Sequence, residues 1–302
     1  MKRRDFILGC SALAALSAAT TALPAWGIEP IARPKPGQMR LSLSAYSMRK
    51  YLAEPKAGGK SMDLFDFVDY CFQLDLPGAE LTSYYFPEDV DDDYILKLKR
   101  HCHLRGVTVS GGAIRNDFCQ SDLSKIQKDI EHTNLWTDRY ALLGAPAIRI
   151  FAGTQPKEQS WETTIERCVT ACKQVCAHAE KKGVWMALEN HGGVTAKAEG
   201  LLEIVRKVES PMFGVNFDCG NFHTTSDPYA ELEAIAPYAV NAQLKVDISR
   251  QGKKEDTDLE RVLKILRDVG YSGWVALEYE AAEEPKEAIP RVIDKLKKVI
   301  DA

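Results

Sequence analysis

The stretch VWMALENHGG, residues 184–193, places a carboxylate directly after a strand-like apolar run. Glu189 follows the apolar residues 184–188 with no turn-forming residue between them. A carboxylate beside a buried strand costs several kcal/mol unless an ion pair, hydrogen bonds or a metal ion compensate it. Glu189 therefore needs a partner. Three later apolar runs carry a polar residue near the same end, and these residues are Asp218, Gln243 and Glu278.

The elements that must position these four residues repeat along the chain. From residue 41 onward, short apolar or β-branched runs alternate with amphipathic stretches, which predicts strands alternating with helices. Successive members of the set Glu189, Asp218, Gln243 and Glu278 are one strand–helix unit apart. Eight strands are predicted, over residues 41–46, 78–86, 107–115, 146–153, 184–192, 213–221, 239–246 and 273–280.

The helices expected between these strands complete the pattern. One ends at Gly106, a glycine suited to cap a helix C-terminus. Eight strand–helix units over about 260 residues predict an α/β fold, the (β/α)₈ TIM barrel, as a single domain over residues 41–302. A doubly wound open sheet is the alternative, but the first strand–helix turn lacks the Gly-x-Gly-x-x-Gly motif. The helices are expected at about 61–75, 93–106, 121–143, 160–182, 196–208, 228–236, 258–269 and 285–301.

In a barrel of this kind, residues at the carboxyl ends of the strands face one site. Three carboxylates and one amide oxygen at that end form a hard, oxygen-rich set of ligands, which suits a divalent ion such as Mn²⁺, Mg²⁺, Co²⁺ or Zn²⁺. Without a cation, three crowded carboxylates would repel one another. We therefore expect one divalent metal ion, bound by Glu189, Asp218, Gln243 and Glu278.

The motifs ALENHGG, NFDCGN, NAQLKVD and ALEYE resemble those of the xylose isomerase-like superfamily of sugar isomerases and epimerases. The resemblance covers about residues 40–300 and is strongest in the second half. In the epimerases of that superfamily, a Glu, Asp, His, Glu quartet binds one divalent metal ion, and the two Glu are also acid/base catalysts. The resemblance implies these roles for Glu189, Asp218 and Glu278. Gln243 stands where the family has His, and its amide oxygen would bind the metal more weakly.

The chemistry suited to this set is removal of a proton from a sugar carbon beside a carbonyl group. The resulting enediolate needs a nearby positive charge, and a carboxylate on each face supplies base and acid. Lys245 lies two residues after Gln243 on the same side of its strand, where it can stabilise an oxyanion. His191 lies two residues after Glu189 and can bind a sugar hydroxyl group. The resemblance places Asn221 in contact with the substrate.

Three residues on other strands are weaker candidates for substrate contact, and each can equally be a structural barrel residue. They are Tyr46, Glu80 and Arg149. The predicted function is a metal-dependent isomerase or epimerase acting on a non-phosphorylated keto-sugar. A lyase is the alternative, because the same proton abstraction on a 3-keto-glycoside would expel the group at C1. A sugar-binding barrel without catalysis is the non-enzyme alternative.

The first 27 residues are predicted to form a cleavable signal peptide. Arg3 and Arg4 precede an apolar stretch and small residues, a pattern typical of export by the twin-arginine route. The apolar stretch is short for a membrane span of about 20 residues, so stable membrane insertion after processing is not expected. Residues 28–40 form a Pro-rich lead-in to the barrel. We expect a periplasmic or exported protein.

The net charge of −4 gives no electrostatic reason to expect a nucleic-acid partner. A nuclease of the endonuclease IV type would also need several histidines at strand ends. The expected partner is a small sugar or glycoside, and a homo-oligomer is left open. Three cysteines spaced by four residues, Cys168, Cys172 and Cys176, are expected to pack in the core as small apolar residues.

Overall fold

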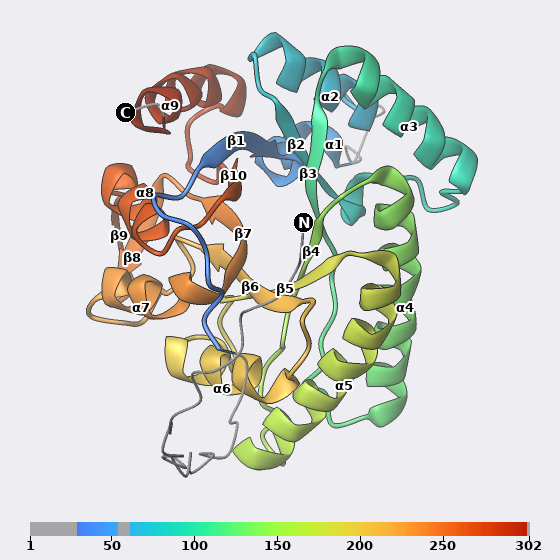
Figure 1. Ribbon diagram of the computed structural model, residues 1–302, viewed down its shortest axis with the longest axis vertical. Coiled ribbons are helices and arrows are strands. Elements are labelled where there is room, and N and C mark those ends of the chain that lie inside the picture. Colours follow the sequence, from blue (N-terminus) through green and yellow to red (C-terminus); the bar gives the residue numbers. More distant parts are fainter. Residues whose placement is uncertain (1–28, 54–60, 301–302) are drawn as a thin grey trace, which may run out of the picture.

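Eight parallel strands close into a barrel in this computed structural model, which describes residues 29–53 and 61–300 (Figure 1). The strand order around the barrel is β1-β10-β7-β6-β5-β4-β3-β2, so strands adjacent in the chain pair with each other and the last pairs with the first. This closure confirms the predicted barrel and excludes the open sheet. The barrel strands are β1 (Met39–Ser44), β2 (Gly78–Thr82), β3 (Thr108–Ala113), β4 (Ala147–Ile150), β5 (Trp185–Glu189), β6 (Phe213–Asp218), β7 (Ala239–Leu244) and β10 (Gly273–Leu277).

A ring of helices surrounds the strands (Figure 1). Asp91 and Ser160 cap the first turns of two helices, because their side chains accept hydrogen bonds from backbone N–H groups two or three residues inside the helix. Gly106 ends one helix in the left-handed conformation, with φ of 66°, as predicted. The long helices are α2 (Leu64–Gln73), α3 (Asp92–Arg105), α4 (Leu123–Leu143), α5 (Trp161–Lys182), α6 (Ala198–Val208), α7 (Pro228–Ile235), α8 (Leu259–Asp268) and α9 (Pro285–Ile300).

The apolar core fills the space between the strands and these helices. Helix α5 shows how its sequence produces this packing: Cys168, Cys172 and Cys176 lie on one face and are at most 1% exposed. All seven cysteines of the described residues are free. The three thiols therefore act as small apolar side chains, as expected from their spacing.

Short elements interrupt the regular alternation. The helix α1 (Arg49–Leu52) and the 3-10 turns 45–48, 83–85 and 236–238 follow or precede barrel strands. A hairpin that the sequence pattern did not predict, β8 (Asp247–Arg250) and β9 (Lys253–Asp256), lies between β7 and α8. Its turn contains Gln251 and Gly252, both with positive φ. The hairpin is therefore part of the connection between β7 and α8, which begins at the carboxyl end of the barrel.

Residues 29–38 cross the opposite end of the barrel without forming a helix or strand. Ile31 donates a backbone hydrogen bond to Pro237, and Arg33 donates to the carbonyl oxygen of Ala239 at the start of β7. The predicted signal peptide, residues 1–27, lies outside the described residues. No helix among the described residues has the length and apolar composition needed to cross a membrane.

Candidate active site

The carboxyl ends of the barrel strands surround a cavity of about 190 Å³. Six of the ten residues predicted for the site lie on its wall. Four further lining residues were not predicted. The wall is formed by Tyr46, Tyr84, Arg115, Arg149, Phe151, Glu189, His191, Lys245, Glu278 and Glu280.

Glu189, at the end of β5, is paired with a cation from the neighbouring strand β4. Arg149 Nε lies 2.8 Å from Glu189 Oε2, and both side chains are almost fully buried. Arg149 is also held by the carbonyl oxygen of Ile114, to which its Nη1 donates at 2.7 Å. Strands β4 and β5 pair in register, so residues at their carboxyl ends are neighbours. This ion pair is the compensation that the buried carboxylate requires.

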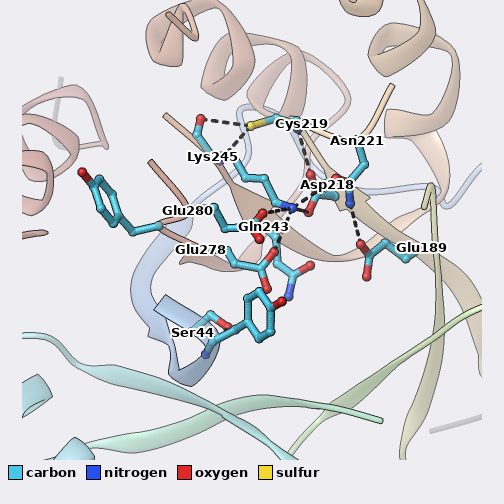
Figure 2. Close-up of polar contacts among 12 residues, drawn as sticks. Ser44, Glu189, Asp218, Cys219, Asn221, Gln243, Lys245, Glu278 and Glu280 are labelled. Atoms are coloured by element: carbon cyan, nitrogen blue, oxygen red, sulfur yellow. Dashed lines mark hydrogen bonds and ion pairs between the residues drawn. The ribbon is translucent and has the colours of Figure 1, made fainter. Parts of the chain in front are cut away.

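Asn221 connects Glu189 to the opposite side of the cavity. Its Nδ2 donates to Glu189 Oε1 at 2.7 Å, and its Oδ1 accepts from Lys245 Nζ at 3.1 Å. Asn221 lies in the turn after β6, three residues beyond Asp218. One amide therefore fixes both a carboxylate and an ammonium group, and Figure 2 shows it between them.

Lys245, directly after β7, extends into a group of three carboxylates (Figure 2). Its Nζ lies 3.3 Å from Asp218 Oδ2, 3.2 Å from Glu278 Oε2 and 2.5 Å from Glu280 Oε2. The Lys245 side chain is 12% exposed. Its aliphatic part is thus buried, while its charged end reaches the cavity wall.

Two buried carboxyl groups near Lys245, those of Glu189 and Asp218, are shifted toward their protonated forms. Burial raises the pKa of Glu189 well above its ordinary value, although the charge of Arg149 opposes the shift. Burial likewise raises the pKa of Asp218 to about 7 against the opposing charge of Lys245. Burial alone would lower the pKa of Lys245, but the surrounding carboxylates outweigh it and raise that pKa. Lys245 is therefore an ammonium group at neutral pH, beside Asp218, whose carboxyl group can exchange a proton there.

Gln243 and Glu80 lie deeper in the barrel and bind each other. Gln243 Nε2 donates to Glu80 Oε1 at 2.7 Å, and Gln243 Oε1 accepts from Asn216 Nδ2 at 2.7 Å. Asn241 Nδ2 donates to Asn216 Oδ1 at 2.8 Å and contacts Glu80 Oε2 at 3.1 Å. Glu80 is 0% exposed and Gln243 is 1% exposed, and neither lines the cavity. Two buried amides occupy the carboxylate of Glu80, which favours the structural role that the sequence left open for this residue.

The predicted metal ligands do not converge on one point. Glu189 is bound by Arg149 and Asn221, and both ends of the Gln243 amide are used in hydrogen bonds. Asp218 and Glu278 lie on either side of the Lys245 ammonium group, and both carboxylates form ion pairs with it. Within residues 29–53 and 61–300, no three His, Cys, Asp or Glu side chains are arranged to hold one metal ion. The residues present do not fit the predicted metal site.

Aromatic rings form the rim near β4 and β5. The rings of Phe151 and His191 have centroids 4.3 Å apart, and the guanidinium carbon of Arg149 lies 3.9 Å from the centre of the Phe151 ring. Part of the His191 ring reaches solvent, yet the burial of the rest lowers the pKa of His191 to about 4, helped by the charges of Arg149 and Lys245. His191 is thus a neutral hydrogen-bonding group at neutral pH.

Some cavity residues were not predicted from the sequence, and one of them carried a usable signal. Glu280 follows Glu278 by two residues, so alternation along an extended chain places both on the same side. The same reasoning identified His191 from Glu189. Tyr84 and Arg115 carried no comparable signal, because both follow the regular part of their strands, β2 and β3.

A model of the protein family described as "Xylose isomerase-like TIM barrel" matches residues 65–299. The chain belongs to this family. The match covers most of the barrel, including the ends of strands β2 to β10 that form the cavity. No curated protein sequence gives a significant match.

Solved structures of the family share the fold at low sequence identity. D-psicose 3-epimerase with D-tagatose from Clostridium cellulolyticum H10 is 16% identical, with a TM-score of 0.70 over 87% of this chain and 99% of that one. The 3-keto-D-glucoside 4-epimerase YcjR from E. coli is 12% identical, with a TM-score of 0.68 over 86% and 100%. The IOLI protein with a bound zinc atom is 19% identical, with a TM-score of 0.68 over 86% and 96%. At these identities the likeness establishes the fold.

Proposed function

We propose that this protein is a sugar isomerase or epimerase that moves a proton at a carbon next to a carbonyl group of a non-phosphorylated keto-sugar. The observation that carries the proposal is the pairing of two carboxylates, Glu189 and Glu278, with two cations, Arg149 and Lys245, on the wall of one cavity. Membership of the family supports it, as do the structurally similar D-psicose 3-epimerase and 3-keto-D-glucoside 4-epimerase.

The reaction begins with one of the two glutamates as the base. Its carboxylate takes the proton from the carbon beside the carbonyl, and the electron pair of that C–H bond moves onto the carbonyl oxygen to give an enediolate. Lys245 and Arg149 supply positive charge for this oxygen in a mostly water-excluded site. No step is assigned to a metal ion, because the ligand residues do not fit one.

The second glutamate completes the reaction by returning a proton. Delivery to the opposite face of the same carbon gives an epimer, and delivery to the adjacent carbon gives an isomer. Burial raises the pKa of Glu189, which favours the protonated form that can return this proton. His191, neutral and on the rim, is placed to bind a sugar hydroxyl group.

A second candidate function is cleavage of 3-keto-glycosides by β-elimination. The same base would remove the C2 proton, the electron pair would form a C1–C2 double bond, and the group at C1 would leave with a proton from the other glutamate. A neighbouring cavity of about 780 Å³ favours this candidate, since it shares Tyr84 and Arg115 with the first. Its wall also includes Asp129, His132 and Trp136, which offer a polar and aromatic surface to a group attached at C1.

The test is to incubate the purified protein in deuterated water with a panel of free ketohexoses and 3-keto-glycosides. Mass spectrometry and NMR would detect deuterium next to the carbonyl, a new epimer or isomer, and any released aglycone. An epimer or isomer containing deuterium supports the first function, and released aglycone supports the second. The Glu189→Gln/Glu278→Gln double variant controls for contaminating activity. Absence of deuterium incorporation, of any epimer or isomer, and of released aglycone with every substrate would contradict both functions.

A further inference from the structure

We infer that the ammonium group of Lys245 takes the place of a divalent metal ion, so that this member of the family binds no catalytic metal. Four oxygen atoms surround Lys245 Nζ at 2.5–3.3 Å. They belong to Asp218, Asn221, Glu278 and Glu280. The contacts with Asp218, Asn221 and Glu278, at 3.1–3.3 Å, are longer than the about 2.0–2.6 Å at which divalent ions bind oxygen.

The ammonium and a metal ion exclude each other at this position. A cation bound by Asp218 and Glu278 would lie within a few ångströms of Nζ, where two positive charges repel strongly in a buried site. The ammonium donates to Asn221 Oδ1, forms ion pairs with the three carboxylates, and is covalently tethered to the chain directly after β7. The positive charge of Lys245 is therefore present in the site whether or not metal ions are available in solution.

The chain around Lys245 is built to direct its side chain inward. The backbone N–H of Lys245 donates to Cys219 Sγ at 3.0 Å, which fixes the start of the side chain. A Cβ atom at Gly220 would lie 2.7 Å from Lys245 Cδ and 3.0 Å from its Cβ, so the glycine leaves the space that the lysine stem fills. Figure 2 shows the stem passing Cys219 to reach the carboxylates.

Gln243, the fourth expected metal ligand, forms hydrogen bonds inside the barrel instead. Gln243 uses its oxygen to accept from Asn216 and its nitrogen to donate to Glu80, both at 2.7 Å. Turning the amide oxygen toward the cavity would break both bonds inside the barrel and leave buried polar groups without partners. Gln243 therefore acts as a structural residue here, which agrees with a site that needs no fourth metal ligand.

The consequence for catalysis rests on the proposed function. Lys245 Nζ lies on the cavity wall, so it can carry the charge of the enediolate oxygen that a metal ion carries in metal-dependent enzymes. The ion pairs with Asp218, Glu278 and Glu280 hold the ammonium group in this position.

The test measures metal binding rather than turnover, so its outcome is independent of the proposed function. Wild-type protein purified without chelator is expected to contain far less than one Mn, Co or Zn atom per chain by elemental analysis. Added Mn²⁺, Co²⁺ or Zn²⁺, and added chelator, should leave its melting temperature unchanged. Lys245→Met removes the ammonium and keeps the apolar stem, so it should gain Co²⁺ binding by calorimetry and a higher melting temperature with the metal.

Lys182→Met is the matched control, because Lys182 pairs with Asp138 on the protein surface far from the cavity, and it should behave as wild type. If Lys245→Met does not fold, Lys245→Gln carries the same test. One tightly bound divalent ion per wild-type chain would overturn the inference. So would failure of both folded Lys245 variants to bind metal, since the ammonium would then not be what excludes it.

Discussion

Arg149 Nε lies 2.8 Å from Glu189 Oε2, and the two side chains are 6% and 3% exposed. The pair joins adjacent strands on the wall of the cavity, and Asn221 holds the other oxygen of the same carboxylate. In the proposed reaction, Glu189 is a positioned carboxylate whose protonation depends on its arginine partner. The stability of the barrel depends on the same contact.

Replacing Arg149 by Met should lower the free energy of unfolding by about 3–5 kcal/mol at pH 8, because a buried carboxylate loses its partner. The pKa of Glu189 is already raised, and without Arg149 it rises further. The folded state then binds a proton more tightly than the unfolded state, so stability increases as the pH falls. Urea denaturation at pH 8 and pH 5.5 measures both effects.

The control for this experiment is Arg261→Met. Arg261 forms an exposed ion pair with Glu233 at 3.4 Å, and its loss should cost less than about 1 kcal/mol at either pH. A cost for Arg149→Met as small as this control would show that the buried pair is not a stabilising contact.

The sequence predicted the architecture because each barrel strand is buried and each helix is amphipathic. Those periodicities are local, so β5 and its polar end, Glu189, were visible in the sequence alone. The hairpin β8–β9 was missed because β9 (Lys253–Asp256) is exposed and carries only charged residues. Without a buried face, a strand leaves no alternating pattern.

The site was only partly predictable, because side-chain partners are chosen across the barrel. Alternation selected Lys245 and His191, and both residues lie on the cavity wall. It could not show that Gln243 would bind Glu80, which lies 163 residues earlier. Nor could it show that Lys245 would reach the carboxylates, since that depends on the space left by Gly220.

Replacing Gln243 by Glu should lower the free energy of unfolding by at least about 1–3 kcal/mol at pH 8. The new carboxylate would replace an N–H donor with an acceptor beside the buried carboxylate of Glu80. As the pH falls, one of the two neighbouring carboxylates binds a proton that the other can share. The loss in the free energy of unfolding should therefore be smaller at pH 5 than at pH 8 in urea denaturation. Gln127→Glu is the matched control, because Gln127 donates to Glu131 on an exposed helix face. Equal losses in the two variants would contradict the buried network.

His191 should remain neutral from pH 7 down to about pH 5, because its pKa is lowered to about 4. NMR titration measures this, with the signal assigned from its absence in His191→Gln. Lys245→Met should raise the pKa of His191, since one positive charge is removed. The unfolded state binds the proton more readily, so the contribution of His191 to stability is lost as the pH falls from about 6.5 toward 4. A pKa of about 6.5 for His191 would contradict the prediction that this residue is neutral at pH 5.

The export expectation concerns residues that the structure does not describe. Replacing Arg3 and Arg4 by Lys should keep the protein in the cytoplasm if the twin-arginine signal is used. Cell fractionation measures the location, and N-terminal sequencing of exported wild-type protein should begin after about residue 22–27. Normal export of the Lys–Lys variant would show that another route is used.

Solvent deuterium exchange by two single variants, Glu189→Gln and Glu278→Gln, tests the central claim most directly. Each substitution keeps the size of the side chain but removes a carboxylate that can move a proton. Once the substrate is known, each variant should lose at least ~100-fold in turnover while keeping the wild-type circular dichroism spectrum. For a one-sided proton abstraction, only one variant should also lose exchange of the substrate proton next to the carbonyl. Turnover near the wild-type rate in both variants would contradict the assignment of these two glutamates as base and acid.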